Sequence, residues 1–320
     1  MRDAVVAVAR RELGAAPDAV EGVAEGLQHE SVRLTVDGRA YVLQFAGSDD
    51  GREADSLARG LHWYGALRDS PVPVPRVVTE SVAEHEGRAY ALVEAVPGET
   101  GERAVSPART RNAAGVLAEI HDHTTFENAG WLAVENDEVA VRRSGDDDEA
   151  SFRDWVRQEG GEAAEILEGA GMRSVADDLE RVTDEHADLL PTAVDPVLCH
   201  GDYSPDNVLF DGDRVVGVLD FDRARAGRAE WDLAMAASAF WMHDPTADWD
   251  VGAAFYDGYR ATRPVADAFE RREPLYRAAT LAVLVSGMLT LDALSEYERE
   301  FYETRLREVV DRAEAALLER

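Results

Sequence analysis

Residues 199–210, CHGDYSPDNVLF, and residues 218–222, VLDFD, decide how this 320-residue sequence is interpreted. Asp202 lies on a loop directly after an apolar segment, and Asn207 follows it five positions later. That spacing lets the loop turn back, so that a carboxylate and an amide oxygen face one site. Asp220 ends the second strand of an expected hairpin, which brings another carboxylate beside Asn207. Oxygen donors with room for water and phosphate are typical of magnesium sites.

This set of residues suits phosphoryl transfer. The reaction requires a carboxylate beside the attacking hydroxyl, oxygen ligands that fix magnesium on the phosphates, and neutralising charge. Asp202 matches the first requirement, and Asn207 with Asp220 matches the second. An inactive polar hairpin would explain one short motif, whereas three elements in this order favour a functional site.

The same residues resemble those of a known family. Residues 200–202 (HGD), Asn207 and residues 220–222 (DFD) form a pattern that resembles the aminoglycoside phosphotransferase and choline kinase branch of kinase-like enzymes. The segment GRAEWDLA at 227–234 is similar to the same branch. A protein kinase matches less well, because no Ala-Pro-Glu segment follows Asp220.

The resemblance implies that ATP and magnesium are used to phosphorylate a hydroxyl of a small molecule. Asp202 would be the catalytic base, and Asn207 and Asp220 the magnesium ligands. Asp222 would bind a second metal or support the first, and Asp232 would brace the catalytic loop. Family acceptors include aminoglycosides, macrolides, choline, homoserine and ketosamines. The sequence leaves the acceptor open, and also the choice between ATP and GTP.

The amino-terminal part mixes strand and helix patterns. Residues 31–36 and 40–45 alternate around an Asp-Gly pair, which is typical of a β-hairpin. A helix is expected over about 52–67, and a strand over 89–96 ends at a Pro-Gly pair.

Helices dominate the rest of the chain. Ser106-Pro107 is a helix start, and further helices are expected near 151–170, near 173–189 and over the carboxyl-terminal part. The one clear β feature of this half is the hairpin at 207–222.

These elements predict an α+β fold with two lobes. A small β-rich, nucleotide-binding lobe would span residues 1–96, and a larger helical lobe with the catalytic loop would span residues 97–320. By resemblance this is a protein-kinase-like fold, with ATP between the lobes.

The nucleotide-binding residues depart from the family pattern. Related enzymes hold the phosphates with a basic residue on the third strand, paired to a Glu on the next helix. Gln44 occupies the strand position, and Glu53 fits the helix position. Gly26 alone represents the glycine-rich loop, and Glu94 to Val96 would form the hinge that binds adenine.

Gln44 can donate hydrogen bonds to phosphate but supplies no charge, so Arg33 and Arg52 are candidates to supply it. This departure supports an alternative function, a non-catalytic nucleotide- or ligand-binding relative. The catalytic-loop residues argue against the alternative, because binding alone would not need them.

Other side chains have simpler interpretations. The His-Asp-His run at 121–123 has no further metal ligands at useful spacing. Cys199 and His200 point apart on an extended segment, so they are not a nucleophile–base pair, and His200 is expected to pack the loop. The aromatic residues around Trp241 either pack in the core or line a substrate pocket.

The charge of the chain is strongly negative. Against 64 Asp and Glu stand 33 Lys and Arg, for a net charge of -31, and every one of these basic residues is Arg. Such a surface repels itself unless salt screens it, and the Debye length falls to about 3 Å at 1 M salt. The composition favours a halophilic source and disfavours a nucleic-acid partner.

The single cysteine, Cys199, excludes a disulfide within the chain and fits a reducing compartment. The longest apolar stretch, residues 278–291, is too short to span a bilayer. We therefore expect a cytoplasmic protein with no membrane partner, and the sequence leaves the oligomeric state open.

Overall fold

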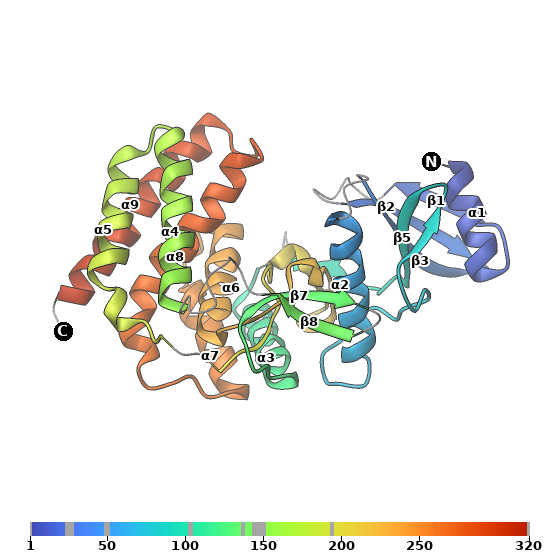
Figure 1. Ribbon diagram of the computed structural model, residues 1–320, viewed down its shortest axis with the longest axis horizontal. Helices are drawn as coiled ribbons and strands as arrows, with labels where there is room; N and C mark the ends of the chain where they lie inside the picture. Colours follow the sequence, from blue (N-terminus) through green and yellow to red (C-terminus); the bar gives the residue numbers. More distant parts are fainter. Residues whose placement is uncertain are drawn as a thin grey trace.

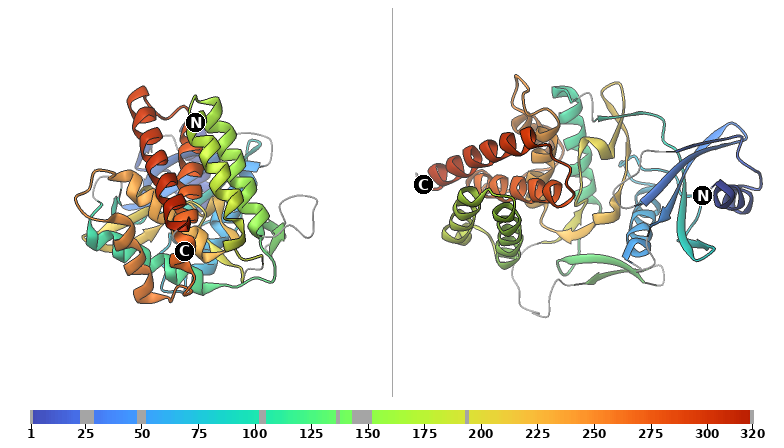
Figure 2. Two further views of the ribbon diagram at one scale, coloured as in Figure 1. Left: turned by 90° about the vertical axis from the view of Figure 1, so that its left-hand side faces the viewer. Right: turned by 90° about the horizontal axis from the view of Figure 1, so that it is seen from above.

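The computed structural model describes residues 2–22, 29–47, 52–101, 105–135, 138–142, 152–192 and 195–318. It confirms a kinase-like α+β fold in which a sheet-rich amino-terminal part joins a helical carboxyl-terminal part (Figure 1). The first and last helices lie at opposite ends of the long axis (Figure 2).

Five antiparallel strands form the amino-terminal sheet, in the order β1-β2-β3-β5-β4. The strands are β1 (Ala19–Gly22), β2 (His29–Val36), β3 (Arg39–Ala46), β4 (Ala83–His85) and β5 (Arg88–Glu94). The expected hairpin is β2–β3, and Asp37 and Gly38 both have positive φ angles, as a two-residue hairpin turn requires. Helix α1 (Arg2–Leu13) packs on one face of the sheet, and α2 (Arg52–Leu67) packs on the other (Figure 1).

Seven longer helices follow in the part of the chain that the structure describes. They are α3 (Pro107–His123), α4 (Phe152–Gly169), α5 (Arg173–Glu185), α6 (Ala229–His243), α7 (Val251–Thr262), α8 (Phe269–Thr290) and α9 (Glu296–Leu318). Ser106 caps α3 as expected, because its hydroxyl accepts a hydrogen bond from the Arg109 amide at 3.2 Å. The apolar stretch near residue 280 lies in α8, whose middle is buried.

The carboxyl-terminal part contains more β structure than the sequence predicted. The expected hairpin is present as β10 (Val208–Asp211) and β11 (Arg214–Val218), and β6 (Glu99–Thr100) extends it. A second sheet, in the order β8-β7-β12-β9, contains β7 (Gly130–Glu135), β8 (Glu138–Arg142), β9 (Val197–Cys199) and β12 (Arg225–Gly227). The prediction of a single β feature is therefore wrong. Strands of three residues, such as β9 and β12, are too short to show alternation.

Among the described residues, the hydrophobic core consists of two clusters, and the boundary between them runs through the amino-terminal sheet and not between the sheet-rich part and the helical part. One cluster joins α1 to the outer face of the sheet, through residues such as Val8, Leu34 and Phe45. The inner face of the sheet and the apolar side of α2 belong to the larger cluster, with residues of the helical part such as Phe221. Helix α2 therefore connects the sheet to the segment around residue 220.

Candidate active site

The loop between β9 and β10 contains the residues that the sequence singled out. His200 is fully buried, and its Nε2 lies 2.9 Å from the Leu219 carbonyl oxygen. Its Nδ1 accepts a hydrogen bond from the Asp202 amide at 3.2 Å, so Nε2 must carry the proton. Burial lowers the pKa of His200, which keeps the ring in this neutral form. As expected, His200 packs the loop, and it ties Asp202 to the segment before Asp220.

Gly201 has a residue-specific role in the loop. Its φ of 79° lies in the left-handed region, and a Cβ at this position would collide with the Arg223 carbonyl oxygen. The loop therefore passes so close to the segment after Asp220 that only glycine fits.

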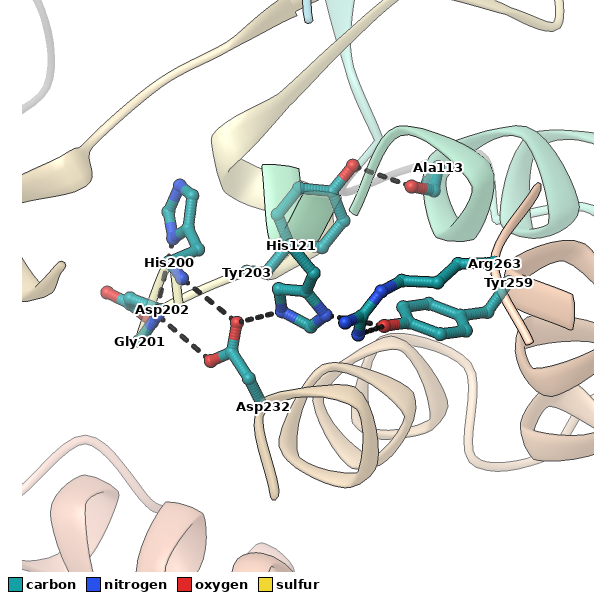
Figure 3. Close-up of polar contacts among 9 residues, drawn as sticks. All are labelled: Ala113, His121, His200, Gly201, Asp202, Tyr203, Asp232, Tyr259 and Arg263. Carbon is teal, nitrogen blue, oxygen red and sulfur yellow. Dashed lines mark hydrogen bonds and ion pairs between the residues drawn. The ribbon is translucent and has the colours of Figure 1, made fainter. Parts of the chain in front are cut away.

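Asp232 of α6 braces the loop, as the resemblance implied. Its two carboxylate oxygens accept hydrogen bonds from the backbone amides of His200 and Gly201, at 2.9 and 3.0 Å (Figure 3). Burial opposes ionisation of Asp232, but the hydrogen bond and charge of His121 outweigh it and lower the pKa. An ionised acceptor therefore fixes the two adjacent backbone amides that precede Asp202.

A chain of hydrogen bonds supports Asp232 from behind (Figure 3). The His121 Nε2 lies 3.1 Å from an Asp232 oxygen, and His121 Nδ1 lies 2.7 Å from the Tyr259 hydroxyl. Arg263 donates to the Tyr259 oxygen at 3.0 Å. Because the ionised Asp232 can only accept, His121 donates to it through Nε2, and the Nδ1 of His121 pairs with the Tyr259 hydroxyl. Each group polarises the next, which strengthens the network inside a buried site.

These hydrogen bonds also exclude a metal at the buried group of His121, Cys199 and Asp232. The ligand atoms lie within 4.8 Å of one another. Both ring nitrogens and both carboxylate oxygens already have hydrogen-bonding partners, however. Burial raises the pKa of Cys199 well above its usual value, so the thiol stays protonated and unreactive.

Asn207 lies in the short 3-10 helix η3 (Pro205–Asn207) that returns the loop to β10. Its side-chain nitrogen donates to the Asp202 carbonyl oxygen at 2.8 Å, and its own carbonyl oxygen accepts from the Leu219 amide at 2.8 Å. The side-chain amide is thereby oriented, and its Oδ1 is left to accept or to ligate.

Asp220 completes the group that the spacing predicted. Its φ of 62° is left-handed, and its amide donates to the Tyr64 hydroxyl of α2 at 2.8 Å. Burial raises the pKa of Asp220 to about 7, and the nearby carboxylates of Asp222 and Asp202 add to the rise. The structure thus brings Asp202, Asn207 and Asp220 together, as expected from the sequence.

Asp222 contacts the amino-terminal sheet, a contact that the sequence analysis missed. It lies in η4 (Phe221–Arg223), and its Oδ2 is 2.5 Å from Nε2 of His29, the first residue of β2. Arg59 of α2 donates to the Asp222 carbonyl oxygen and, at 2.5 Å, to the Leu132 carbonyl oxygen. The only sequence signal for this contact was that His29 lies three residues after Gly26 of the expected glycine-rich loop.

On the inner face of the amino-terminal sheet, fewer polar side chains have hydrogen-bonding partners among the described residues. Gln44 pairs in register with Ser31 and Ala91, on the inner face that also presents Arg33. The side-chain amide of Gln44 makes no hydrogen bond to any residue that the structure describes. The Glu53 carboxylate accepts a hydrogen bond from the Gly47 amide. Gly26 and the Arg52 side chain lie outside the described residues.

The expected hinge follows β5. The Ala95 amide donates to the Ala40 carbonyl oxygen at 2.9 Å, and the Glu94 amide donates to Arg76 at 2.8 Å. The Val96 amide has no hydrogen-bonding partner among residues 29–47, 52–101 and the other described segments. The Val96 side chain lies against β11, where a Cβ on Gly217 would be 3.0 Å away.

The aromatic residues near the end of α6 divide into two groups. Phe240 is buried and packs against Tyr203 and Phe255, so it belongs to the core. Trp241 lines a small pocket, and His243 forms an ion pair with Asp206 of the catalytic loop at 3.3 Å. Of the helices that the structure describes, none is long and apolar enough to cross a membrane.

Known proteins share this fold and sequence pattern. The chain is 25% identical to homoserine kinase of Xanthobacter autotrophicus over 273 residues, which cover 84% of this chain and 79% of that protein. It is 27% identical to homoserine kinase of Methylobacillus flagellatus over 251 residues, 77% of this chain and 71% of that one.

Among solved structures, a thermostable mutant of the aminoglycoside phosphotransferase APH(4)-Ia, in ternary complex with AMP-PNP and hygromycin B, superposes with a TM-score of 0.71. The match covers 98% of this chain and 99% of that one at 19% identity, and it shows the shared fold. The model of the phosphotransferase enzyme family matches residues 19–269. The chain therefore belongs to the phosphotransferase enzyme family.

Proposed function

We propose that the protein transfers the γ-phosphate of ATP, with magnesium, to a hydroxyl group of a small molecule. The observation that carries this proposal is the convergence of Asp202, Asn207 and Asp220 at one end of a braced loop. The pKa of Asp220 is raised to about 7, first by burial and then by the neighbouring carboxylates of Asp222 and Asp202. A divalent cation would stabilise their ionised forms.

The residues fit magnesium. Asp220 offers carboxylate oxygens, and Asn207 offers Oδ1 because its nitrogen is already bonded to the Asp202 carbonyl oxygen. Hard oxygen donors of this kind suit magnesium. When bound, the metal would neutralise charge on the phosphates.

Asp202 would act on the acceptor. It orients the acceptor hydroxyl and takes its proton late, as the acceptor oxygen bonds to the γ-phosphorus and the bond to the β-phosphate oxygen breaks. The backbone on both sides of Asp202 is fixed, by Asp232 through the Gly201 amide and by Asn207 through the Asp202 carbonyl oxygen. This preorganisation holds the base where the acceptor arrives.

The nucleotide would lie between a lobe of residues 1–96 and a lobe of residues 97–320. Glu94 and Val96 would bind adenine through their backbone groups. The Val96 backbone amide supports this, because it makes no hydrogen bond to any described residue. The inner face of the sheet, with Gln44, would lie toward the phosphates. Gly26 and Glu53 would flank them.

The acceptor belongs to the class of small hydroxylated molecules. The sequence relatives carry the name homoserine kinase, and the solved relative was crystallised with hygromycin B. Both molecules are alcohols, and this shared chemistry is the level at which we propose the acceptor.

The test is a screen of hydroxylated acceptors for ATP consumption in molar potassium chloride, which would screen the net charge of -31. With an acceptor in hand, Asp202→Asn should lower kcat roughly 10²- to 10⁴-fold, because it removes the base. Asp211→Asn is the matched control, since Asp211 is an exposed aspartate at the end of β10, the strand that follows the loop of Asp202. If Asp202→Asn keeps activity within twofold of the control, the assignment of the base is wrong.

A non-catalytic nucleotide-binding protein is the second candidate, and the uncharged Gln44 favours it. Magnesium-dependent ATP hydrolysis without any acceptor distinguishes the two. If the protein binds ATP tightly but shows neither hydrolysis nor transfer to any acceptor, the second candidate is supported.

A further inference from the structure

A small pocket in the helical part carries an unusual charge. It has a volume of about 150 Å³ and lies among α6, α8 and α9, at the end of the molecule away from the amino-terminal sheet (Figure 1). Its lining includes Arg277 of α8 and Arg305 and Arg312 of α9. Glu308 is the only carboxylate among the lining residues, although acidic residues outnumber basic ones 64 to 33 in the whole chain.

The three helices each present one face to the pocket. Ser238 and Trp241 are three positions apart on α6, and Arg305, Glu308 and Arg312 follow the same side of α9. Residues three, four and seven apart lie on one side of a helix, so the arginines point to a common space. The cluster is therefore a consequence of helix packing.

The arginines of the pocket differ in their partners. Arg305 is held by Glu308 at 2.7 Å and lies over the Phe301 ring. The guanidinium groups of Arg277 and Arg312 form no ion pair or hydrogen bond with any residue that the structure describes. Other arginines of the helical part are paired with acids, as Arg272 is with Glu230 at 2.7 Å. Arg277 is half-buried beside Gly252 of α7, where Asp250 also lies, but no carboxylate of the described residues pairs with it, which is unfavourable for a partly desolvated cation.

We propose that this pocket binds a small anion, a carboxylate or phosphate group, between Arg277 and Arg312. Guanidinium groups bind both anions through paired hydrogen bonds. Trp241 and Ser238 form the neutral wall of the pocket, and its volume, several times the share of one water molecule in the liquid, suits a small anion. Binding of an anion here does not depend on phosphoryl transfer by the protein, and the anion is either a separate ligand or the acid group of an acceptor.

The test measures binding of inorganic phosphate and of succinate, each against potassium chloride of equal ionic strength. Both anions should raise the melting temperature in a saturable way, because a ligand that binds only the native state stabilises it. Arg277→Gln and Arg312→Gln should each weaken both anions at least tenfold by titration calorimetry. Arg312→Lys should retain part of the affinity, since it keeps the charge.

Arg271→Gln is the matched control, because Arg271 is an exposed arginine of α8 that does not line the pocket. Arg312 is exposed, so Arg312→Gln should fold even if Arg277→Gln does not. Succinate separates this pocket from any site that prefers phosphate. The proposal fails if wild type responds to neither anion beyond chloride, or if the pocket variants respond like Arg271→Gln.

Kinetics then distinguish the source of the anion. If the anion is the acid group of an acceptor, Arg312→Gln should raise KM for that acceptor tenfold at unchanged kcat, and succinate should compete with it. If the anion is a separate ligand, Arg312→Gln should abolish succinate binding and leave KM unchanged. Either result supports the anion site and assigns its ligand.

Discussion

The catalytic loop and the inner face of the amino-terminal sheet differ in how completely the protein satisfies their polar groups. In the loop, the His200 ring, the Gly201 amide and the Asn207 side-chain nitrogen all have partners within the chain. On the sheet, the side-chain amide of Gln44 makes no hydrogen bond to a described residue, and Arg33 is exposed. The loop is therefore preorganised by the protein itself, whereas the Gln44 side chain on the inner face of the sheet is left without a hydrogen-bonding partner from the described residues.

The largest effect is expected at Asp220. Asp220→Asn should abolish magnesium-dependent binding of ATP, because it removes the charged ligand of the proposed metal site. Asparagine tolerates the left-handed backbone at φ 62°, so the fold should survive. Calorimetry with magnesium-ATP measures the effect, and Asp206→Asn, in the loop between β9 and β10, is the control. Unchanged affinity in Asp220→Asn would remove Asp220 from the metal site.

The next effect tests whether the loop is held as rigidly as its contacts indicate. Asp232→Ala should destabilise the protein by about 3–5 kcal/mol, because it leaves His121 and two loop amides unpaired in a buried place. Asp122→Ala removes an exposed partner of Arg263 and should cost less than about 1 kcal/mol. Denaturant unfolding gives both values. Similar losses in the two variants would mean that the brace adds little.

The sequence predicted the residues of the loop better than it predicted the residues that hold the loop in place. Asp202, Asn207 and Asp220 lie within one short segment, so spacing alone could place them on a common site. Asp232 was found only through the family pattern. Its partner His121 is 111 residues away, and Asp222 meets His29 across 193 residues. Contacts of that kind depend on how helices and sheets pack, which local patterns do not encode.

The sheet was predicted where it alternates and missed where it is short. The β2–β3 hairpin has eight-residue strands and an Asp-Gly turn, so its pattern was visible. The role of α2 was only partly visible. Its apolar side was predicted, but its packing against the segment after Asp220, with Tyr64 bonded to the Asp220 amide, follows from the tertiary fold.

A smaller effect is expected at Gln44. Gln44→Lys should tighten ATP binding by about 1–3 kcal/mol, the value of a charged hydrogen bond, if the inner face lies toward the phosphates. Calorimetry at fixed salt measures the change, and Arg39→Lys at the far end of β3 is a control for a lysine on this strand. A tenfold loss would mean that another cation, such as Arg33 or Arg52, already occupies the place. No change would mean that Gln44 does not face the phosphates.

The smallest effect is expected from the histidines, because the pKa of His29 in the sheet and the pKa of His200 in the loop shift in opposite directions. Burial alone would lower the pKa of His29, but its hydrogen bond to Asp222 and the charges of Asp222, Asp220 and Glu53 outweigh it and raise the pKa above 6.5. Burial lowers the pKa of His200 below 6.5.

The signs of the stability changes follow from linkage. His29 stabilises the fold fully below about pH 6.5, and that contribution is lost as pH rises through its raised pKa in the folded protein. His200 does the opposite, because the unfolded chain takes up a proton near pH 6.5 while the native ring stays neutral, so its contribution falls as pH drops below that value. Among the eight histidines of the chain, NMR titration of the metal-free protein should place His29 above pH 6.5 and His200 below it, with His29→Gln identifying the resonance of His29. The stability difference between wild type and His29→Gln, on the order of 1 kcal/mol at pH 6, should shrink toward higher pH. If that difference grows with pH instead, the His29–Asp222 contact does not hold a protonated ring, and the sheet and the loop are joined mainly by α2.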